Sequence, residues 1–368
     1  MSALFSPYDI GGLALPNRIV IPPMCQYSAR DGLATGWHLL HLGNLALSGA
    51  GLLIMEATAV SPEGRITPWD LGLWSDAHAS ALQETLDVIR TYSSIPLAIQ
   101  IGHAGRKAST NRPWKGGAYV PPSEGGWLPM APSPIPFTAG DPQPTALIPS
   151  EIERIVEAFV AAAERAHRLG IDLIELHAAH GYLLHEFLSP LSNQREDQYG
   201  GSLENRMRLP LRIFREMRDR LPDSLPIGVR ISASDWIEGG WNLEESTQFT
   251  QALKTLGAAY IHVSSGGLSP AQKIPLEPGY QVPFAEAIRK ATGMPTIAVG
   301  LIQEPLAAEA LIASGKADLI GIARGMVFDP RWPWHAAVTL KANIEIAAPY
   351  WRCVPGSEAH RFSAAPHP

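Results

Sequence analysis

Cysteine is scarce in this sequence, and charged side chains make up only 17% of it. Cys25 and Cys353 are far apart and form no C-x-x-C pair. This excludes a disulfide framework and any four-thiolate zinc or iron–sulfur site made by this chain alone. The same cysteine usage predicts a reducing, cytoplasmic location. The net charge of −6 provides no basic surface for nucleic acid, so no nucleic-acid partner is expected.

Long apolar runs are also missing. The longest, such as "GAGLLIMEATAV" from Gly49, are too short to cross a bilayer, so no membrane association is expected. The first ten residues lack a basic segment followed by an apolar one, and we therefore expect no signal peptide. With 46% hydrophobic residues in 368, the chain is long and apolar enough to bury a sizeable core. These features are typical of a globular protein.

Short β-branched or aliphatic runs alternate with longer amphipathic stretches. One such stretch, 151–169, has apolar residues at helical spacing and is followed by Gly170, as helix ends favour. The apolar runs cover 18–24, 51–60, 96–102, 171–177, 226–232, 258–264, 294–300 and 317–323. Eight such units predict an α/β fold, a closed (β/α)8 TIM barrel. A doubly wound open sheet is the alternative, weakened because no G-x-G-x-x-G follows the first run.

A proline-rich segment breaks this alternation after the third predicted strand. Residues 112–149 contain ten prolines and show no helical period. A disordered linker is one interpretation, but four aromatic residues favour a packed excursion over the face where barrel active sites lie: Trp114, Tyr119, Trp127 and Phe137. We predict one barrel domain over 1–345, with the excursion at about 104–149. Residues 346–368 would form a C-terminal tail able to reach a neighbouring subunit.

Polar residues stand where the predicted strands end, and in a barrel these ends surround the active-site mouth. The fourth strand is followed by His177, His180 and Tyr182. Other strand ends contribute Pro23, Met24, Cys25, Gln26, Tyr27, Glu56, Ala57, Thr58, Gln100, His103 and Arg230. Small residues after the last two strands, with Arg324 opening a helix, indicate a phosphate site. An ordinary strand-to-helix turn remains the alternative there.

His177 and His180 have the i, i+3 spacing of some metal ligands. Spacing alone is weak evidence, because His38 and His41 share it within a helical pattern with no other chemistry nearby. No third ligand or H-E-x-x-H motif is evident, so we predict no metal, although a purely structural pair stays open. The remaining interpretation is a pair of N–H donors that polarise a substrate carbonyl. Tyr182, protonated at neutral pH, would then suit a proton donor.

Long motifs carry a family resemblance. The stretch "PNRIVIPPMCQYSARDGLATGWHLLHLGNLALSGAGLLIMEATAVSPEGRITPWDLGLWSD" closely resembles the start of the Old Yellow Enzyme family of flavin-dependent ene-reductases. The similar subgroup is the bacterial xenobiotic-reductase, or thermophilic-like, branch. The resemblance continues through "QIGHAGRKAS", "ELHAAHGYLLHEFLSPLSNQREDQYGGSLENRMR", "SSGGLSP", "PGYQVPFAEAIR" and "DLIGIARGMVFDP". It therefore covers nearly the whole chain.

The resemblance implies a barrel that holds non-covalent FMN, is reduced by NADPH or NADH, and reduces activated C=C bonds by ping-pong hydride transfer from flavin N5. Small electron-poor alkenes would be substrates, phenols inhibitory ligands, and the assembly a homodimer or homotetramer. Arg230 would stabilise the reduced flavin near N1, and Cys25 would tune the flavin without acting as a nucleophile. The implied cofactor-binding residues are Pro23, Met24, Cys25, Ala57, Gln100, Arg230, Gly300, Ala323 and Arg324. The family often has Gly where this chain has Ala323.

The resemblance also implies roles at the substrate side. His177 and His180 would hydrogen-bond to the substrate oxygen, Tyr182 would protonate the α-carbon, and Tyr27 would add a contact. "APYWRCVPG" resembles a tail whose aromatic and arginine enter the neighbouring active site, which makes Trp351 and Arg352 candidates; a surface tail is the alternative. Two other functions stay open: a flavin-binding redox sensor or storage module without alkene turnover, and a metal-dependent barrel lyase or hydrolase.

Overall fold

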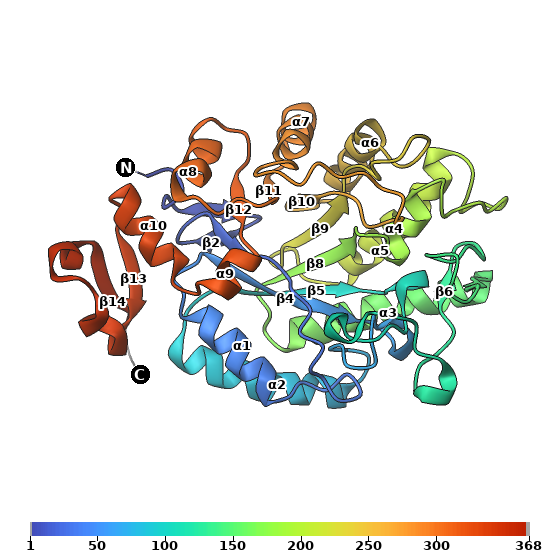
Figure 1. Cartoon of the computed structure of the whole chain (residues 1–368), viewed down its shortest axis with the longest axis horizontal. Coiled ribbons are helices and arrows are strands. Elements are labelled where there is room, and N and C mark those ends of the chain that lie inside the picture. The colour runs from blue at the N-terminus through green and yellow to red at the C-terminus, as the bar shows by residue number, and fades with distance from the viewer. Residues whose placement is uncertain (1, 366–368) are drawn as a thin grey trace.

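The computed structural model describes residues 2–365 and contains a closed parallel barrel (Figure 1). Around the barrel the strands follow the order β10-β11-β12-β3-β4-β5-β8-β9. They are β3 (Ile19–Ile21), β4 (Leu52–Ala59), β5 (Leu97–Gly102), β8 (Leu173–Ala178), β9 (Ile227–Ser232), β10 (Ile261–Ser264), β11 (Thr296–Ala298) and β12 (Leu319–Gly321). Each predicted run overlaps one of these strands, and β8 alone extends one residue beyond its run. The predicted barrel is confirmed, and the open-sheet alternative is wrong.

Helices surround the barrel on its outside (Figure 1). They are α1 (Gly36–Ala46), α2 (Asp76–Tyr92), α3 (Pro149–Arg168), α4 (Leu183–Leu188), α5 (Leu203–Arg220), α6 (Leu243–Thr255), α7 (Val282–Thr292), α8 (Pro305–Ala313), α9 (Arg324–Phe328) and α10 (Trp332–Leu340). Helix α3 shows why they form. Pro149 starts its first turn, Ile152, Ile155 and Phe159 are fully buried on one face, and the chain leaves through Gly170 at φ +67°.

The smaller elements are two-stranded pairs and single 3₁₀ turns. The strands are β1 (Tyr8–Ile10), β2 (Leu13–Leu15), β6 (Met130–Ala131), β7 (Thr145–Ala146), β13 (Ile344–Ala347) and β14 (Phe362–Ala365). The 3₁₀ turns are η1 (Pro62–Gly64), η2 (Gly105–Lys107), η3 (Pro113–Lys115), η4 (Pro122–Glu124), η5 (Ala348–Cys353) and η6 (Gly356–Arg361). In the described part of the chain, every helix is too short or too polar to span a membrane.

Alternation along the strands divides the core into two. Ile19 and Ile21 pack with the surrounding helices, whereas Val20 between them belongs to a cluster inside the barrel. That inner cluster also contains Leu52, Ala98, Leu173 and Ile297, and it is closed by Ile10 and Leu15 of the β1–β2 hairpin. Farther along the same strands the inward positions become polar, as Gln100 and Glu175 show. The barrel interior is thus apolar at one end and polar toward the strands' carboxyl ends.

The proline-rich excursion is packed against the barrel. The Trp127 indole donates a hydrogen bond to the Glu63 carbonyl at 2.8 Å, and the Arg65 guanidinium lies 4.8 Å from a Trp127 ring centroid. Tyr119 donates to the Trp127 carbonyl at 3.2 Å. The Phe137 ring centroid lies 4.6 Å from the Lys107 ammonium. These contacts, rather than a regular sheet or helix, give the segment its shape.

The C-terminal segment forms a small unit beside α10, at one end of the molecule (Figure 1). Strands β13 and β14 pair in parallel, and Ile344, Ile346 and Phe362 pack with Ala337 of α10. Strand β13 therefore spans the boundary that we predicted at 345. The last three residues of the predicted tail, 366–368, lie outside the described residues.

Candidate active site

His177, His180 and Tyr182 come together where β8 ends. The His177 ring centroid lies 5.2 Å from that of His180 and 4.9 Å from that of Tyr182, and both pairs are nearly perpendicular. Burial is the main cause that holds the pKa of both histidines well below the usual value, with the nearby Arg230 as a second cause. Burial also raises the pKa of Tyr182 well above its usual value. At neutral pH the group is therefore two neutral imidazoles and a protonated phenol.

The turn that carries these side chains has an unusual backbone. His180 has φ +61° and Gly181 φ +73°, both in the left-handed region. A β-carbon on Gly181 would lie 2.2 Å from the Gly267 carbonyl oxygen, so only glycine fits there. The His180 amide donates to Ser232 Oγ at 2.9 Å, and Lys107 Nζ donates to the His180 carbonyl at 2.9 Å. Ser232 and Lys107, from two other segments, thus hold this turn.

The two imidazoles differ in their hydrogen bonds. Nδ1 of His177 accepts a bond from the Ala179 amide at 3.3 Å, which places the ring hydrogen on Nε2. Nε2 of His180 lies 2.7 Å from Ser264 Oγ, a contact that sequence reasoning missed. The Ser264 hydroxyl also lies 3.2 Å from Oε1 of Gln281. If it donates to Gln281, Nε2 of His180 carries the ring hydrogen and donates to Ser264; if it donates to Nε2, the hydrogen of His180 is on Nδ1. His177 can therefore offer its Nε2–H group to a ligand, and His180 offers a second N–H group, on Nδ1, when Ser264 donates to its Nε2.

A cavity of about 170 Å³ lies at the ends of the last barrel strands. Its lining includes Arg230, Ser264, Gly300, Ala323 and Arg324. Gly300 has φ +121°, and a β-carbon there would come within 3.2 Å of the Gln281 side chain. Burial lowers the pKa of Arg230, and its Nε is buried without a hydrogen-bond partner among residues 2–365. A buried cation with an unpaired donor beside a glycine-lined cavity fits an anionic cofactor such as FMN.

A polar network lies below this cavity, inside the barrel. The fully buried Glu175 carboxylate accepts hydrogen bonds from Gln100 at 2.8 Å, Tyr260 at 2.9 Å and His262 at 2.8 Å. Burial alone would raise the pKa of Glu175, but His262 and the other donors hold it below its usual value. The network fixes the amide of Gln100, one of the predicted cofactor residues. Glu175 and His262 could have been found from the polar interruptions at every second position of their strands.

The predicted residues after β3 form another side of the mouth. Pro23, Met24, Cys25 and Tyr27 are all partly exposed, although they follow a buried strand. Glu56, where the pairing of β4 and β5 shifts register, accepts a hydrogen bond from the Gln26 amide at 2.9 Å. His38 Nε2 lies 3.4 Å from the same carboxylate. The expectation that His38 has no other chemistry nearby is therefore wrong, because the register shift brings Glu56 to it.

The structure also places the other predicted residues: Ala57, Tyr27, Trp351 and Arg352. Ala57 pairs with Gln100 across β4 and β5. Tyr27, at φ +53°, meets the Trp114 ring edge-on at 5.8 Å between centroids. Trp351 and Arg352 lie on η5 and are exposed in this single chain, and neither lines the 170 Å³ cavity. No group of three or more His, Cys, Asp or Glu residues that could hold a metal occurs within residues 2–365.

Cys25 is expected to react slowly with alkylating reagents. Burial raises the pKa of its thiol well above the usual value, and Asp70 and Glu56 add to this, so little thiolate exists at pH 7.5. Cys353 is exposed. Iodoacetamide at pH 7.5 should therefore modify Cys353 at least about tenfold faster than Cys25, measured by mass spectrometry of peptides. A Cys353→Ser variant serves as control, and rapid labelling of Cys25 in it would contradict the assignment of an inert thiol.

Together, the barrel and its mouth are typical of a (β/α)8 enzyme, with a cavity lined by glycine and arginine beside two histidines and a tyrosine. The model of the NADH:flavin oxidoreductase / NADH oxidase family matches residues 3–343. The chain is 42% identical to the NADPH dehydrogenase of Geobacillus thermodenitrificans (strain NG80-2), covering 95% of this chain and 98% of that protein. It is 44% identical to the NADPH dehydrogenase of Bacillus licheniformis, with the same coverage of both.

The fold agrees with these relatives. The structure of morphinone reductase in complex with tetrahydroNAD has a TM-score of 0.75 to this chain at 26% identity, covering 98% of this chain and 94% of the other. This chain therefore belongs to the NADH:flavin oxidoreductase family, the Old Yellow Enzymes, in its bacterial subgroup. It is an FMN-dependent oxidoreductase that takes hydride from NADPH or NADH.

Proposed function

We propose that this protein is an ene-reductase that reduces the C=C bond of α,β-unsaturated carbonyl or nitro compounds. The observation that carries the proposal is the arrangement of His177, His180 and Tyr182 on one turn beside the cavity that contains Arg230. Bound FMN, once reduced by NADPH or NADH, supplies the hydride from its N5. Both half-reactions use this one mouth in turn, so the kinetics are ping-pong.

The chain's own residues do the remaining work. His177 donates from Nε2 and His180 from Nδ1 to the carbonyl or nitro oxygen, which withdraws electron density and makes the β-carbon electrophilic. Both rings are neutral, so they act as hydrogen-bond donors rather than as acids. Tyr182 delivers a proton to the α-carbon from its hydroxyl. Tyr27, partly exposed at the same mouth, contacts the substrate.

The positions of several residues support the proposed cofactor contacts. Arg230 would stabilise negative charge on the reduced ring system, because its Nε is buried and has no hydrogen-bond partner within residues 2–365. Gly300, Ala323 and Arg324 would hold the phosphate, because they share the lining of one cavity. The contact at Ala323 uses only its backbone N–H, so the extra methyl group is tolerated. Pro23, Met24, Cys25, Ala57 and Gln100 line the ring.

Several wider features belong to the same proposal. Phenols bind in place of the substrate, with their oxygen at the two imidazoles. The protein works in the cytoplasm as a homodimer or homotetramer, with one barrel domain over 1–345. Residues 346–368 extend toward a neighbouring subunit, whose active site receives Trp351 and Arg352. Both residues are exposed, as such a role requires.

An anaerobic experiment separates the reductase from a flavin-binding sensor. The enzyme is reduced with one equivalent of NADPH, and 2-cyclohexen-1-one is then added while flavin absorbance is followed. An ene-reductase regains its oxidised spectrum and forms cyclohexanone in equal amount. Cyclohexanone added in place of the alkene is the matched control and should leave the reduced spectrum unchanged. A reduced spectrum that persists with the enone, and with a nitroalkene, would show that the protein stores or senses electrons without alkene turnover.

A further inference from the structure

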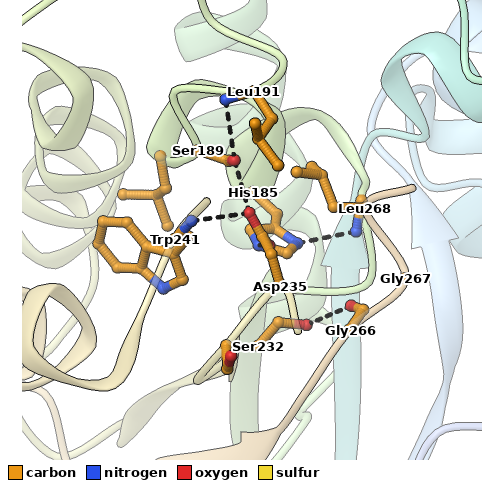
Figure 2. Close-up of polar contacts among 12 residues, drawn as sticks. His185, Ser189, Leu191, Ser232, Asp235, Trp241, Gly266, Gly267 and Leu268 are labelled. Atoms are coloured by element: carbon orange, nitrogen blue, oxygen red, sulfur yellow. Dashed lines mark hydrogen bonds and ion pairs between the residues drawn. The ribbon is translucent and has the colours of Figure 1, made fainter. Parts of the chain in front are cut away.

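A second polar cluster contains His185, Ser189, Asp235 and Trp241 (Figure 2). His185 of α4 has its Nε2 2.9 Å from Oδ1 of Asp235, which follows β9. The other carboxylate oxygen of Asp235 accepts hydrogen bonds from Ser189 Oγ at 2.6 Å and from the Trp241 amide at 2.8 Å. His185, Ser189 and Asp235 are all fully buried. The cluster is therefore shielded from solvent.

The cluster contains the residue types of a nucleophilic triad, but its geometry excludes that role. In a triad the serine hydroxyl bonds to the histidine, which in turn bonds to the aspartate. Here the Ser189 hydroxyl donates to Asp235 instead, and all three side chains lie out of reach of a substrate. The Asp235 carboxylate is the centre of the cluster, and His185 lies between it and the active-site turn.

His185 connects the cluster to the catalytic turn. The Gly181 amide donates a hydrogen bond to Nδ1 of His185 at 2.9 Å. Because Nδ1 accepts, the ring is neutral and its hydrogen is on Nε2. Nε2 lies 2.9 Å from Oδ1 of Asp235 without hydrogen-bond alignment, so the carboxylate acts on it through its charge. If that hydrogen moved to Nδ1, two N–H groups would face each other and the bond to Gly181 would be lost. The charge of Asp235 therefore selects the tautomer that the turn needs.

The turn depends on such bonds because its backbone is unfavourable. His180 carries a β-carbon at φ +61°, a conformation that such residues rarely adopt. Ser232 Oγ accepts the His180 amide and donates to the Gly266 carbonyl at 2.8 Å, so it supports the neighbouring peptide. The amides of His180 and Gly181 are thus held separately, the first by Ser232 and the second by the His185–Asp235 pair. Loss of the hydrogen bond to either amide would let the His180 ring move.

We propose that Asp235 and His185 are positioning residues that fix the His180–Gly181 turn by setting the tautomer of His185. The inference rests on the proposed function in one respect, the role of His180 as a donor to the substrate oxygen. Neither residue touches the substrate or the cofactor. Their contribution is to keep the His180 imidazole aimed at the substrate before it binds.

The test compares substitutions that differ in hydrogen bonding rather than in size. In Asp235→Asn the amide N–H₂ group, if it faces Nε2, favours the wrong tautomer, and His185→Leu removes the acceptor. Both should weaken p-cresol binding to the FMN-loaded enzyme by roughly tenfold or more, with normal FMN content. In His185→Gln the side-chain oxygen can accept from Gly181 while its N–H₂ group donates to Asp235. This variant should bind p-cresol within about threefold of the wild type.

Hydrogen exchange provides a readout that does not depend on the proposed function. Peptides covering 178–183 should exchange faster in Asp235→Asn and His185→Leu than in the wild type, and His185→Gln should restore protection. Ser189→Ala keeps the Trp241 bond to Asp235, so it is the milder variant if the others fold poorly, and it should increase exchange in the same peptides. Ile213→Val, a buried change on α5, is the control for a general loss of stability and should leave these peptides protected.

The outcomes separate the two proposals. If the wild type neither binds p-cresol nor reduces an enone, the proposed function fails, and exchange alone then decides the role of the pair. Wild-type exchange and affinity in Asp235→Asn, or equal damage from His185→Gln and His185→Leu, would overturn the tautomer mechanism. Faster exchange confined to 178–183, with recovery in His185→Gln, would support it.

Discussion

Replacing Tyr182 with phenylalanine should slow alkene reduction by about two to four orders of magnitude while changing flavin reduction by NADPH less than about threefold. The reason is that the phenol supplies a proton only when the alkene is reduced. Burial raises the pKa of Tyr182, so its hydroxyl is protonated at neutral pH and is ready to donate. Phenylalanine keeps the ring that packs against His177 at 4.9 Å and loses only the hydroxyl.

Stopped-flow measurement of the two half-reactions checks this directly. Flavin bleaching by NADPH reports the first, and recovery of colour with 2-cyclohexen-1-one reports the second, both without oxygen. Tyr199→Phe is a matched control, because Tyr199 is also buried and its hydroxyl contacts Arg212 on the outer helices. It should leave both rates unchanged. Equal slowing of both half-reactions in Tyr182→Phe would mean that the residue shapes the pocket and does not donate the proton.

The barrel could be predicted because its strands are buried on both faces and therefore read as continuous apolar runs. The ends of the strands were predicted less exactly than their positions. The run at 294–300 contains a strand of only three residues, Thr296–Ala298, because the chain then bends around the glycine-lined cavity at Gly300. The helix expected at 151–169 covers Pro149–Arg168, since proline is accepted in the first helical turn. Periodicity locates an element well and its termini poorly.

The mouth could be predicted only as a set of residues at strand ends. His177, His180 and Tyr182 follow one strand, so the sequence places them together. The Ser264 and Lys107 contacts to His180 could not be foreseen, because these residues are 84 and 73 positions away and meet it only in the closed barrel. Asp235 reaches the turn through His185 for the same reason. The candidate catalytic residues could therefore be predicted from the sequence. The residues that orient them could not, because they meet the site only through tertiary contacts.

Replacing His177 with alanine should slow enone reduction by roughly two orders of magnitude and weaken p-cresol binding, with FMN retained. His177 Nε2 carries the ring hydrogen, and within residues 2–365 the ring's one hydrogen bond is that from Ala179 to Nδ1, so the Nε2 donor is free for the substrate oxygen. His180→Ala should reduce the rate of enone reduction and the affinity for p-cresol less, because the His180 ring divides its bonding between the ligand and Ser264 at 2.7 Å. The two effects come from donors to one oxygen, so the double variant should fall short of their product.

Enone-dependent flavin reoxidation and p-cresol titration of the FMN-loaded variants measure these effects. His335→Ala, on the exposed face of α10, is the control for removing an imidazole and should behave as the wild type. If His177→Ala binds p-cresol normally and is reoxidised at the wild-type rate, the imidazoles do not polarise the substrate. Tyr182 would then protonate a substrate oriented by other groups, of which Tyr27 is the nearest predicted candidate. Because burial holds the pKa of both histidines well below the usual value, both rings are neutral at pH 6.5 and 7.5, and the expected ratios should be the same at both.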